Sequence, residues 1–326
     1  MLGAFIETVS GGNLMAMLIL VAVMSLILGM GLPTTANYIV VSSLMAPIIV
    51  ALGAKSGLLI PLVAAHLFVF YFGILADDTP PVGLAAFAAA AISGGDPIKT
   101  GVQGFMYDIR TALLPFLFIF NTELLLMDAT PLKAVFVLIV AVIAMMLFAA
   151  ATQSYFFAKS RWWESLILLL VAFTLFRPGF WLDRVEPEFT ERPGTEIAAI
   201  AKSMPADASL LITVSGPNFD NPDQTDVTTL TVPLGKPAEG AARLSKVGLA
   251  VAVDGDKALF EEPLPGTKFE ALSNTYDFYD DTNPVVVSAV KVANDRMLKE
   301  VFYIPALFLL ALVIMLQRRR QTQPAF

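Results

Sequence analysis

Two short stretches of this 326-residue chain combine glycine, proline and oxygen-bearing side chains inside strongly apolar surroundings. The first is GMGLPTTAN at residues 29–37, and the second is ADDTPPVG at residues 76–83. Proline has no backbone N–H and clashes with the preceding helical turn, so each stretch should interrupt a helix and free backbone groups. Threonine, asparagine and free carbonyl groups offer uncharged oxygen ligands to an alkali cation, and free N–H groups at a helix start suit an anion such as a carboxylate.

The candidate cation- and substrate-binding residues all belong to these two stretches. They are Gly31, Pro33, Thr34, Thr35, Asn37, Asp77, Asp78, Thr79, Pro80, Pro81 and Gly83. The three threonines are the candidate metal ligands, and the two aspartates either bind the cation or cap the following half-helix. Simpler roles stay open: helix capping after Pro33, a plain kink at the two prolines, or aspartates that face water.

The composition predicts an integral membrane protein. Hydrophobic residues make up 56% and charged residues 15% of the chain, whereas a soluble domain is about 25% charged. The net charge of −7 argues against a nucleic-acid partner, and the absence of cysteine excludes disulfides and thiolate sites. A bilayer core takes about 20 apolar residues to cross. Four apolar runs bounded by charge fit that length: residues 112–127, 132–151, 165–181 and 301–316.

The first hundred residues differ, because two apolar stretches stop at the motifs and then resume. Irregular backbone inside a bilayer is tolerated only where it is buried or lines a wet cavity, and such paired breaks are typical of transporter binding sites. We therefore predict a re-entrant hairpin with its tip at residues 31–37, followed by an unwound helix at residues 77–83. The alternatives are a turn outside the membrane at the first motif and an aqueous loop at the second.

Basic residues predict the orientation. Lys159 and Arg161 place one loop, and the arginines at 318–320 place the C-terminus, in the cytoplasm. One predicted span leads out of the first segment and one leads back to the second, so residues 182–299 between these spans, which carry 19 acidic and 11 basic residues, must be periplasmic. β-prone runs at 209–216, 228–235, 248–254 and 284–293 and a helix at 196–203 predict a small β-rich fold there.

The chain thus divides into four predicted parts. Residues 1–128 form the transport repeat with its hairpin and broken helix, and residues 129–181 form transmembrane helices. Residues 182–299 form the acidic periplasmic domain, and residues 300–326 form the last transmembrane helix and a basic cytoplasmic tail. The fold class is a mainly α-helical, polytopic membrane protein with a small β-rich domain outside the bilayer.

The two motifs, together with MYDIRTALLPF at residues 106–116, resemble the fused permease subunit of tripartite ATP-independent periplasmic (TRAP) transporters. The acidic region resembles an uncharacterised extension of some of these permeases. The resemblance implies an elevator-type secondary transporter of the bacterial inner membrane that imports organic acids such as dicarboxylates by sodium symport. A periplasmic solute-binding protein would deliver the substrate, and Thr34, Thr35 and Thr79 would bind sodium, the expected cofactor.

The family builds its transport domain from two inverted repeats, and only the second resembles this sequence. We therefore expect the remaining half of the permease as a further partner and expect the chain to start inside a longer protein. Residues 1–13 show no signal peptide.

Two other functions fit parts of the sequence. An intramembrane aspartyl protease is suggested by Tyr107-Asp108 and by the PAL sequence at 305–307, but no Gly-x-Gly-Asp element accompanies them. A membrane-anchored structural or sensory module would leave both proline breaks unexplained. No enzymatic activity is expected.

His66 should make a packing or interhelical hydrogen-bond contact rather than relay protons, and Asp108 and Arg110 are expected in a cytoplasmic loop.

Overall fold

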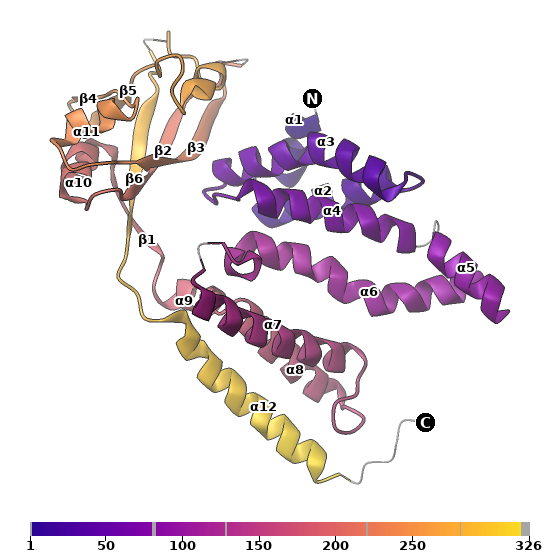
Figure 1. The fold of residues 1–326 in the computed structure, drawn as a ribbon. Coiled ribbons are helices and arrows are strands. Elements are labelled where there is room, and N and C mark those ends of the chain that lie inside the picture. Colours follow the sequence, from indigo (N-terminus) through magenta and orange to yellow (C-terminus); the bar gives the residue numbers. More distant parts are fainter. Residues whose placement is uncertain (1, 80–82, 128, 220, 281, 321–326) are drawn as a thin grey trace.

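The computed structural model describes residues 2–79, 83–127, 129–219, 221–280 and 282–320 (Figure 1). Helices dominate up to residue 185 and return at the C-terminal end. They are α1 (Leu2–Ser10), α2 (Leu14–Gly29), α3 (Thr34–Lys55), α4 (Leu62–Asp78), α5 (Leu84–Ser93), α6 (Pro97–Phe120), the 3-10 turn η1 (Thr122–Leu125), α7 (Pro131–Thr152), α8 (Trp162–Phe176), α9 (Gly179–Val185), η4 (Lys299–Phe302) and α12 (Tyr303–Arg318).

Three helices among the described residues are long and apolar enough to cross a membrane: Thr34–Lys55, Pro131–Thr152 and Lys299–Arg318. The helices predicted at 132–151 and 301–316 are confirmed as candidate spans by their length and composition. The span predicted at 165–181 is wrong as a single helix, because the chain bends by 80° between α8 and α9. Pro178 at the bend cannot continue the hydrogen-bond ladder of α8.

The span predicted at 112–127 is also wrong, because α6 begins 15 residues earlier at Pro97 and ends at Phe120. Asp96 caps the helix by accepting a hydrogen bond from the Lys99 N–H, and Pro97 takes the first helical position. Asp108 and Arg110 therefore lie inside α6 and not in a loop.

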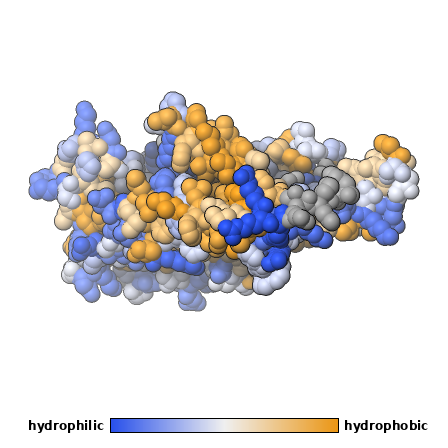
Figure 2. All heavy atoms as spheres, turned by 90° about the horizontal axis from the view of Figure 1, so that it is seen from below, coloured by the Kyte–Doolittle hydropathy of each residue, from blue (hydrophilic) through white to orange (hydrophobic). Residues whose placement is uncertain are grey.

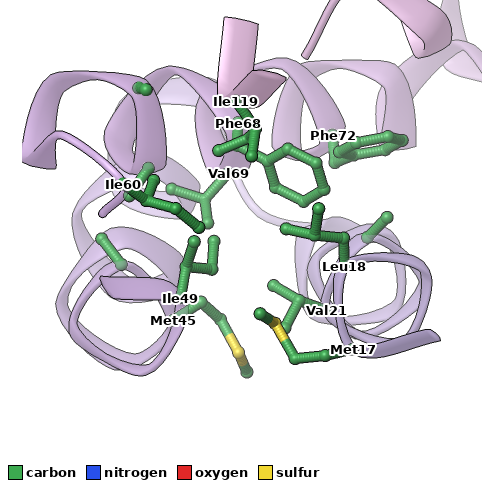
Figure 3. Packing of buried hydrophobic residues seen from close by; sticks show 14 of the residues in the cluster. Met17, Leu18, Val21, Met45, Ile49, Ile60, Phe68, Val69, Phe72 and Ile119 are labelled. Carbon is green, nitrogen blue, oxygen red and sulfur yellow. The ribbon is translucent and has the colours of Figure 1, made fainter. Parts of the chain in front are cut away.

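Helices α2, α3, α4 and α6 share one apolar core. Figure 3 shows Leu18 of α2, Ile49 of α3 and Phe68 of α4 converging in it, and Ile119 of α6 belongs to the same cluster. Leu117, on another face of α6, belongs to a second core with α7, α8 and α12. Helix α6 therefore connects the two bundles. Apolar side chains also cover much of the surface in Figure 2, as expected for a protein in lipid.

The strands lie between residues 189 and 293 and pair antiparallel in one sheet. Their order is β3-β2-β6-β5-β4, and β1 pairs with β6. The bounds are β1 (Phe189–Pro193), β2 (Ser209–Pro217), β3 (Thr225–Pro233), β4 (Val251–Asp254), β5 (Lys257–Phe260) and β6 (Val286–Ala293), with α10 (Ile197–Ser203) and α11 (Gly240–Lys246) beside them. The four predicted strands and the predicted helix are confirmed, whereas β1, β5 and α11 were not predicted.

A charged residue sits at the centre of this small fold. Arg243 of α11 is fully buried. Its guanidinium donates to five backbone carbonyl groups, those of Ala201, Met204, Pro205, Leu234 and Gly235, at 2.6–3.0 Å. A buried charge is costly unless its donors are satisfied, so these bonds fix the loops around α10 and α11.

The sheet is attached to the helices in two ways. β1 and β6 form a ribbon that rises from α9 and α12 (Figure 1). On its other side, the sheet contacts the end of α3, where the Lys55 ammonium lies 3.0 Å from Glu7 of α1 and 3.1 Å from Asp226 of β3. Asp226 is almost completely buried, so this three-residue ion cluster (Glu7, Lys55 and Asp226) belongs to a packed interface.

Candidate functional site

The first break is a short turn between α2 and α3. Gly31 adopts a φ of +85°, a left-handed conformation that favours glycine. Pro33 precedes the first helical residue of α3 with a φ of −58°. The turn therefore comprises residues 30–33 alone, and Thr34, Thr35 and Asn37 lie in the first turn of α3. That is shorter than the tip predicted at 31–37, because the fixed φ of Pro33 starts the helix at once.

Asn37 is the residue of the first motif that the fold buries completely. Its side-chain Nδ2 donates to the backbone carbonyl of Gly73 in α4 at 2.7 Å. Its Oδ1 is buried and has no hydrogen-bond partner among the described residues. An unpaired buried amide oxygen is costly, so Asn37 presents an acceptor that a ligand could satisfy.

The ends of α2 and α4 meet beside Asn37. A Cβ added at Gly29 would lie 2.7 Å from Asn37 Nδ2 and 2.8 Å from the Ala76 Cβ, and one at Gly73 would lie 3.1 Å from Asn37 Nδ2. Small residues thus let the two helices approach closely, as is typical of helix contacts in membranes. Sequence reasoning missed Gly29 and Gly73 as contact residues, although both interrupt runs of larger apolar side chains.

The second break follows α4. Asp77 and Asp78 form its last turn, but their side chains lie outside the described residues, as do Pro80 and Pro81 entirely. The Thr79 hydroxyl donates to the Leu75 carbonyl at 2.5 Å. Gly83, with a φ of +36°, precedes α5.

The structure therefore brings part of the predicted site together. Gly29 is the last residue of α2 before the first break, and Ala76 lies three residues before Thr79 of the second break. Because Gly29 and Ala76 pack against each other, both breaks begin next to this helix contact. Thr34 and Thr35 are exposed at the start of α3. The N-cap residue of α3 is Pro33, which makes no side-chain cap hydrogen bond, so the capping role considered for the threonines stays an untested alternative.

This arrangement has a definite polarity. The C-terminal ends of α2 and α4 carry partial negative charge, and the N-terminal end of α3 carries partial positive charge, because peptide dipoles add along a helix. Carbonyl ends and the Asn37 oxygen suit a cation, whereas the first N–H groups of α3 suit an anion. The two kinds of group lie within a few residues of each other.

His66 lies on α4 and contacts Tyr38, the residue that follows Asn37. Its Nδ1 is 3.0 Å from the Tyr38 hydroxyl of α3. The predicted interhelical hydrogen bond is therefore confirmed.

The two segments predicted to share the cytoplasmic side do lie together. Arg320 donates to the Lys159 carbonyl at 3.2 Å and forms an ion pair with the buried Glu164. Gln317 of α12 accepts from the backbone N–H groups of Phe157 and Ala158. The sheet lies at the opposite end of α8 and α12 (Figure 1).

Comparison with family models divides the chain near the start of α7. Residues 1–133 match the tripartite ATP-independent periplasmic transporter, DctM component, and residues 134–323 match a domain of unknown function, DUF3394. The chain belongs to the DUF3394 family and carries a DctM segment in front of that domain. No curated protein and no solved structure matches it.

The match confirms the resemblance to a fused TRAP permease with an uncharacterised extension. Both helix breaks belong to the DctM segment. The DUF3394 segment contains α7, α8 and α12 as well as the sheet, so it combines apolar helices with the acidic fold.

Proposed function

We propose that this chain is the permease component of a secondary active transporter that imports organic acids, carboxylates above all, by sodium symport. Its partners would be a periplasmic solute-binding protein and the remaining half of the permease, in the bacterial inner membrane. The DctM match identifies the chain as a TRAP permease component. The residues at the two breaks support the finer assignment.

The observation that carries the proposal is the position of Asn37. Its Oδ1 is buried without a partner among the described residues, at the place where the carbonyl ends of α2 and α4 meet. Sodium prefers uncharged oxygen ligands at such unwound helix ends. Asp77 and Asp78 are the last residues of α4, and Thr79 follows them. We propose the side chains of these three residues as further ligands.

The start of α3 supports carboxylate binding. The helix is 22 residues long, and its first N–H groups have no intrahelical acceptor. Thr34 and Thr35 add two exposed hydroxyl groups to this positive end. An organic acid bound there would lie next to the proposed cation, so each charge would favour the binding of the other.

We further propose that residues 182–299 lie in the periplasm and that the C-terminus lies in the cytoplasm. The sheet would then face the solute-binding protein. Deletion of residues 190–295 from the complete permease should reduce uptake, and unchanged uptake would refute a docking role.

The decisive test is uptake by proteoliposomes that contain the complete permease and its binding protein, with and without a sodium gradient. Asn37→Ala removes the buried oxygen and should weaken the apparent sodium affinity about tenfold or more. Thr35→Val tests the exposed donor without disturbing the core. Ser43→Ala, at an exposed hydroxyl on the same helix, is the matched control and should behave as the wild type.

The outcome also separates the competing functions. A structural or sensory module would show no sodium-dependent uptake in any variant. Transport with unchanged sodium dependence in Asn37→Ala, Asp78→Ala and Thr79→Ala would show that the cation site lies elsewhere.

A further inference from the structure

A cavity of about 240 Å³ lies at the base of the ribbon that carries the sheet. Three segments meet around it: the end of α6 with η1, the bend between α8 and α9, and the two chain segments that lead to and from the sheet. It therefore lies at the junction between the DctM segment and the DUF3394 domain, far from the helix breaks along the chain.

The carboxylates that line the cavity are already paired. Glu123 accepts hydrogen bonds from Lys133 and Lys299. Burial alone would raise the pKa of Glu123, but these two lysines hold it below its ordinary value. Arg296 lies 2.7 Å from Asp183 and 3.9 Å from Glu188.

Arg177 is the exception among the basic residues that line the cavity. No hydrogen bond, and no ion pair within 4.0 Å, joins its guanidinium to a described residue; Asp183, which is paired with Arg296, attracts it from a longer distance. Its carbon centre lies 4.0 Å from the centre of the Phe120 ring and 5.5 Å from that of Phe180. Aromatic rings interact with the face of a guanidinium, so the two rings position Arg177 while its five N–H donors find no acceptor in the described part of the chain.

The simpler explanation for Arg177 is a favourable charge at the C-terminal end of α8. That explanation does not account for the cavity beside it, in which each other lining charge has a partner. A planar guanidinium matches the two oxygens of a carboxylate or phosphate. Phe180, Trp181 and Tyr303 lie close by at the helix ends, as aromatic residues do at a membrane–water interface.

We propose that this cavity binds a singly charged oxyanion on the Arg177 guanidinium. The ligand is a phosphodiester or a carboxylate, supplied either by a lipid headgroup or by a soluble acid. Because Phe120 and Asn121 come from the DctM segment and Arg177 comes from DUF3394, the bound anion would strengthen the junction between the two. The site does not depend on the proposed sodium and substrate sites.

The test uses the purified full chain. In the lipid arm, native mass spectrometry compares retention of phosphatidylglycerol with that of uncharged diacylglycerol. In the soluble arm, acetate is compared with chloride at equal ionic strength for its effect on thermal unfolding. Arg177→Gln should weaken binding about tenfold or more in one of the arms. Arg184→Gln is the matched control, because Arg184 stacks on the same Phe180 ring at 4.1 Å but does not line the cavity.

A second variant keeps the arginine in place. A Cβ at Gly179, which lines the cavity, would meet no atom within 4 Å. Gly179→Leu should therefore fold and should reduce binding by occupying the space. Loss of phosphatidylglycerol retention in both variants identifies the headgroup, and loss of the acetate effect identifies a soluble carboxylate; either result supports the site. Equal binding by wild type and Gly179→Leu in both arms would overturn it, even if Arg177→Gln fails to fold.

Discussion

Gly29 shows how one residue sets the geometry of the candidate site. Its missing side chain lets α2 approach Asn37 and Ala76 to distances that a Cβ would not permit. The motif indicated from sequence that the helix would break after this residue, and Asn37 was predicted as an oxygen donor. The contact with α4 was not predictable, because it depends on which helix packs against the hairpin, and spacing along the chain does not specify that.

We predict that Gly29→Ala destabilises the protein by about 1–3 kcal/mol, because the added methyl group overpacks the contact. Gly104→Ala is the control: it lies in α6, and its Cβ would meet no atom within 4 Å. That change should be neutral or stabilising, since alanine favours a helix. Thermal unfolding of the full chain measures both, and equal melting temperatures would contradict the close approach.

A second prediction concerns Arg243. Arg243→Met removes the donors of five backbone carbonyl groups in the fold that contains the sheet. We expect a loss of at least about 3 kcal/mol, because buried acceptors would be left unpaired. Arg192→Met, on the exposed ribbon strand β1, should cost little. Hydrogen exchange of α10 and α11 would locate the effect, and unchanged protection there would contradict it.

At the scale of elements, the hydrophobic pattern predicted the helices and strands that have a clear apolar face. The strands with an apolar face, such as β2 and β6, were predicted from sequence. β1 was missed because it is a mostly exposed ribbon, and β5 because its three apolar residues lie between the charged residues Lys257 and Glu261. The start of α6 was missed because its first turns are polar, so apolar length underestimates the helix that the Asp96 cap begins.

The last helix provides an element-scale prediction. Gln317 is fully buried, accepts from two backbone N–H groups and donates to Ser160 and Glu164. Gln317→Leu should release the end of α12 from the 157–160 loop and lower the melting temperature, because the polar groups around it lose their partners.

Met315→Ala is its control, since that side chain is 54% exposed on the same helix. The fluorescence of Trp162 and Trp163, next to Glu164, reports the change. A Gln317→Leu protein that unfolds like Met315→Ala would exclude this anchoring role.

At the scale of the whole molecule, the ion cluster of Glu7, Lys55 and Asp226 joins parts that are far apart in sequence. Lys55→Met leaves the buried Asp226 carboxylate without its ammonium partner. We predict exchange about tenfold faster or more in both β3 and the last turn of α3, since charged hydrogen bonds are lost. Lys99→Met, at an exposed position, should change neither segment. Faster exchange confined to α3 would show that the sheet is held by other contacts.

That cluster joins the sheet back to α3, so the contacts along the chain form a closed loop. From α3 the chain runs through α6, α7 and α8 to the ribbon and the sheet, and Asp226 then returns to Lys55. If α2 and α3 move relative to α7 and α8, either the ribbon bends and the sheet follows, or the contact between Lys55 and Asp226 breaks. Any displacement of α3 relative to α8 would therefore be transmitted to the sheet as strain, through the ion cluster on one side and the ribbon on the other.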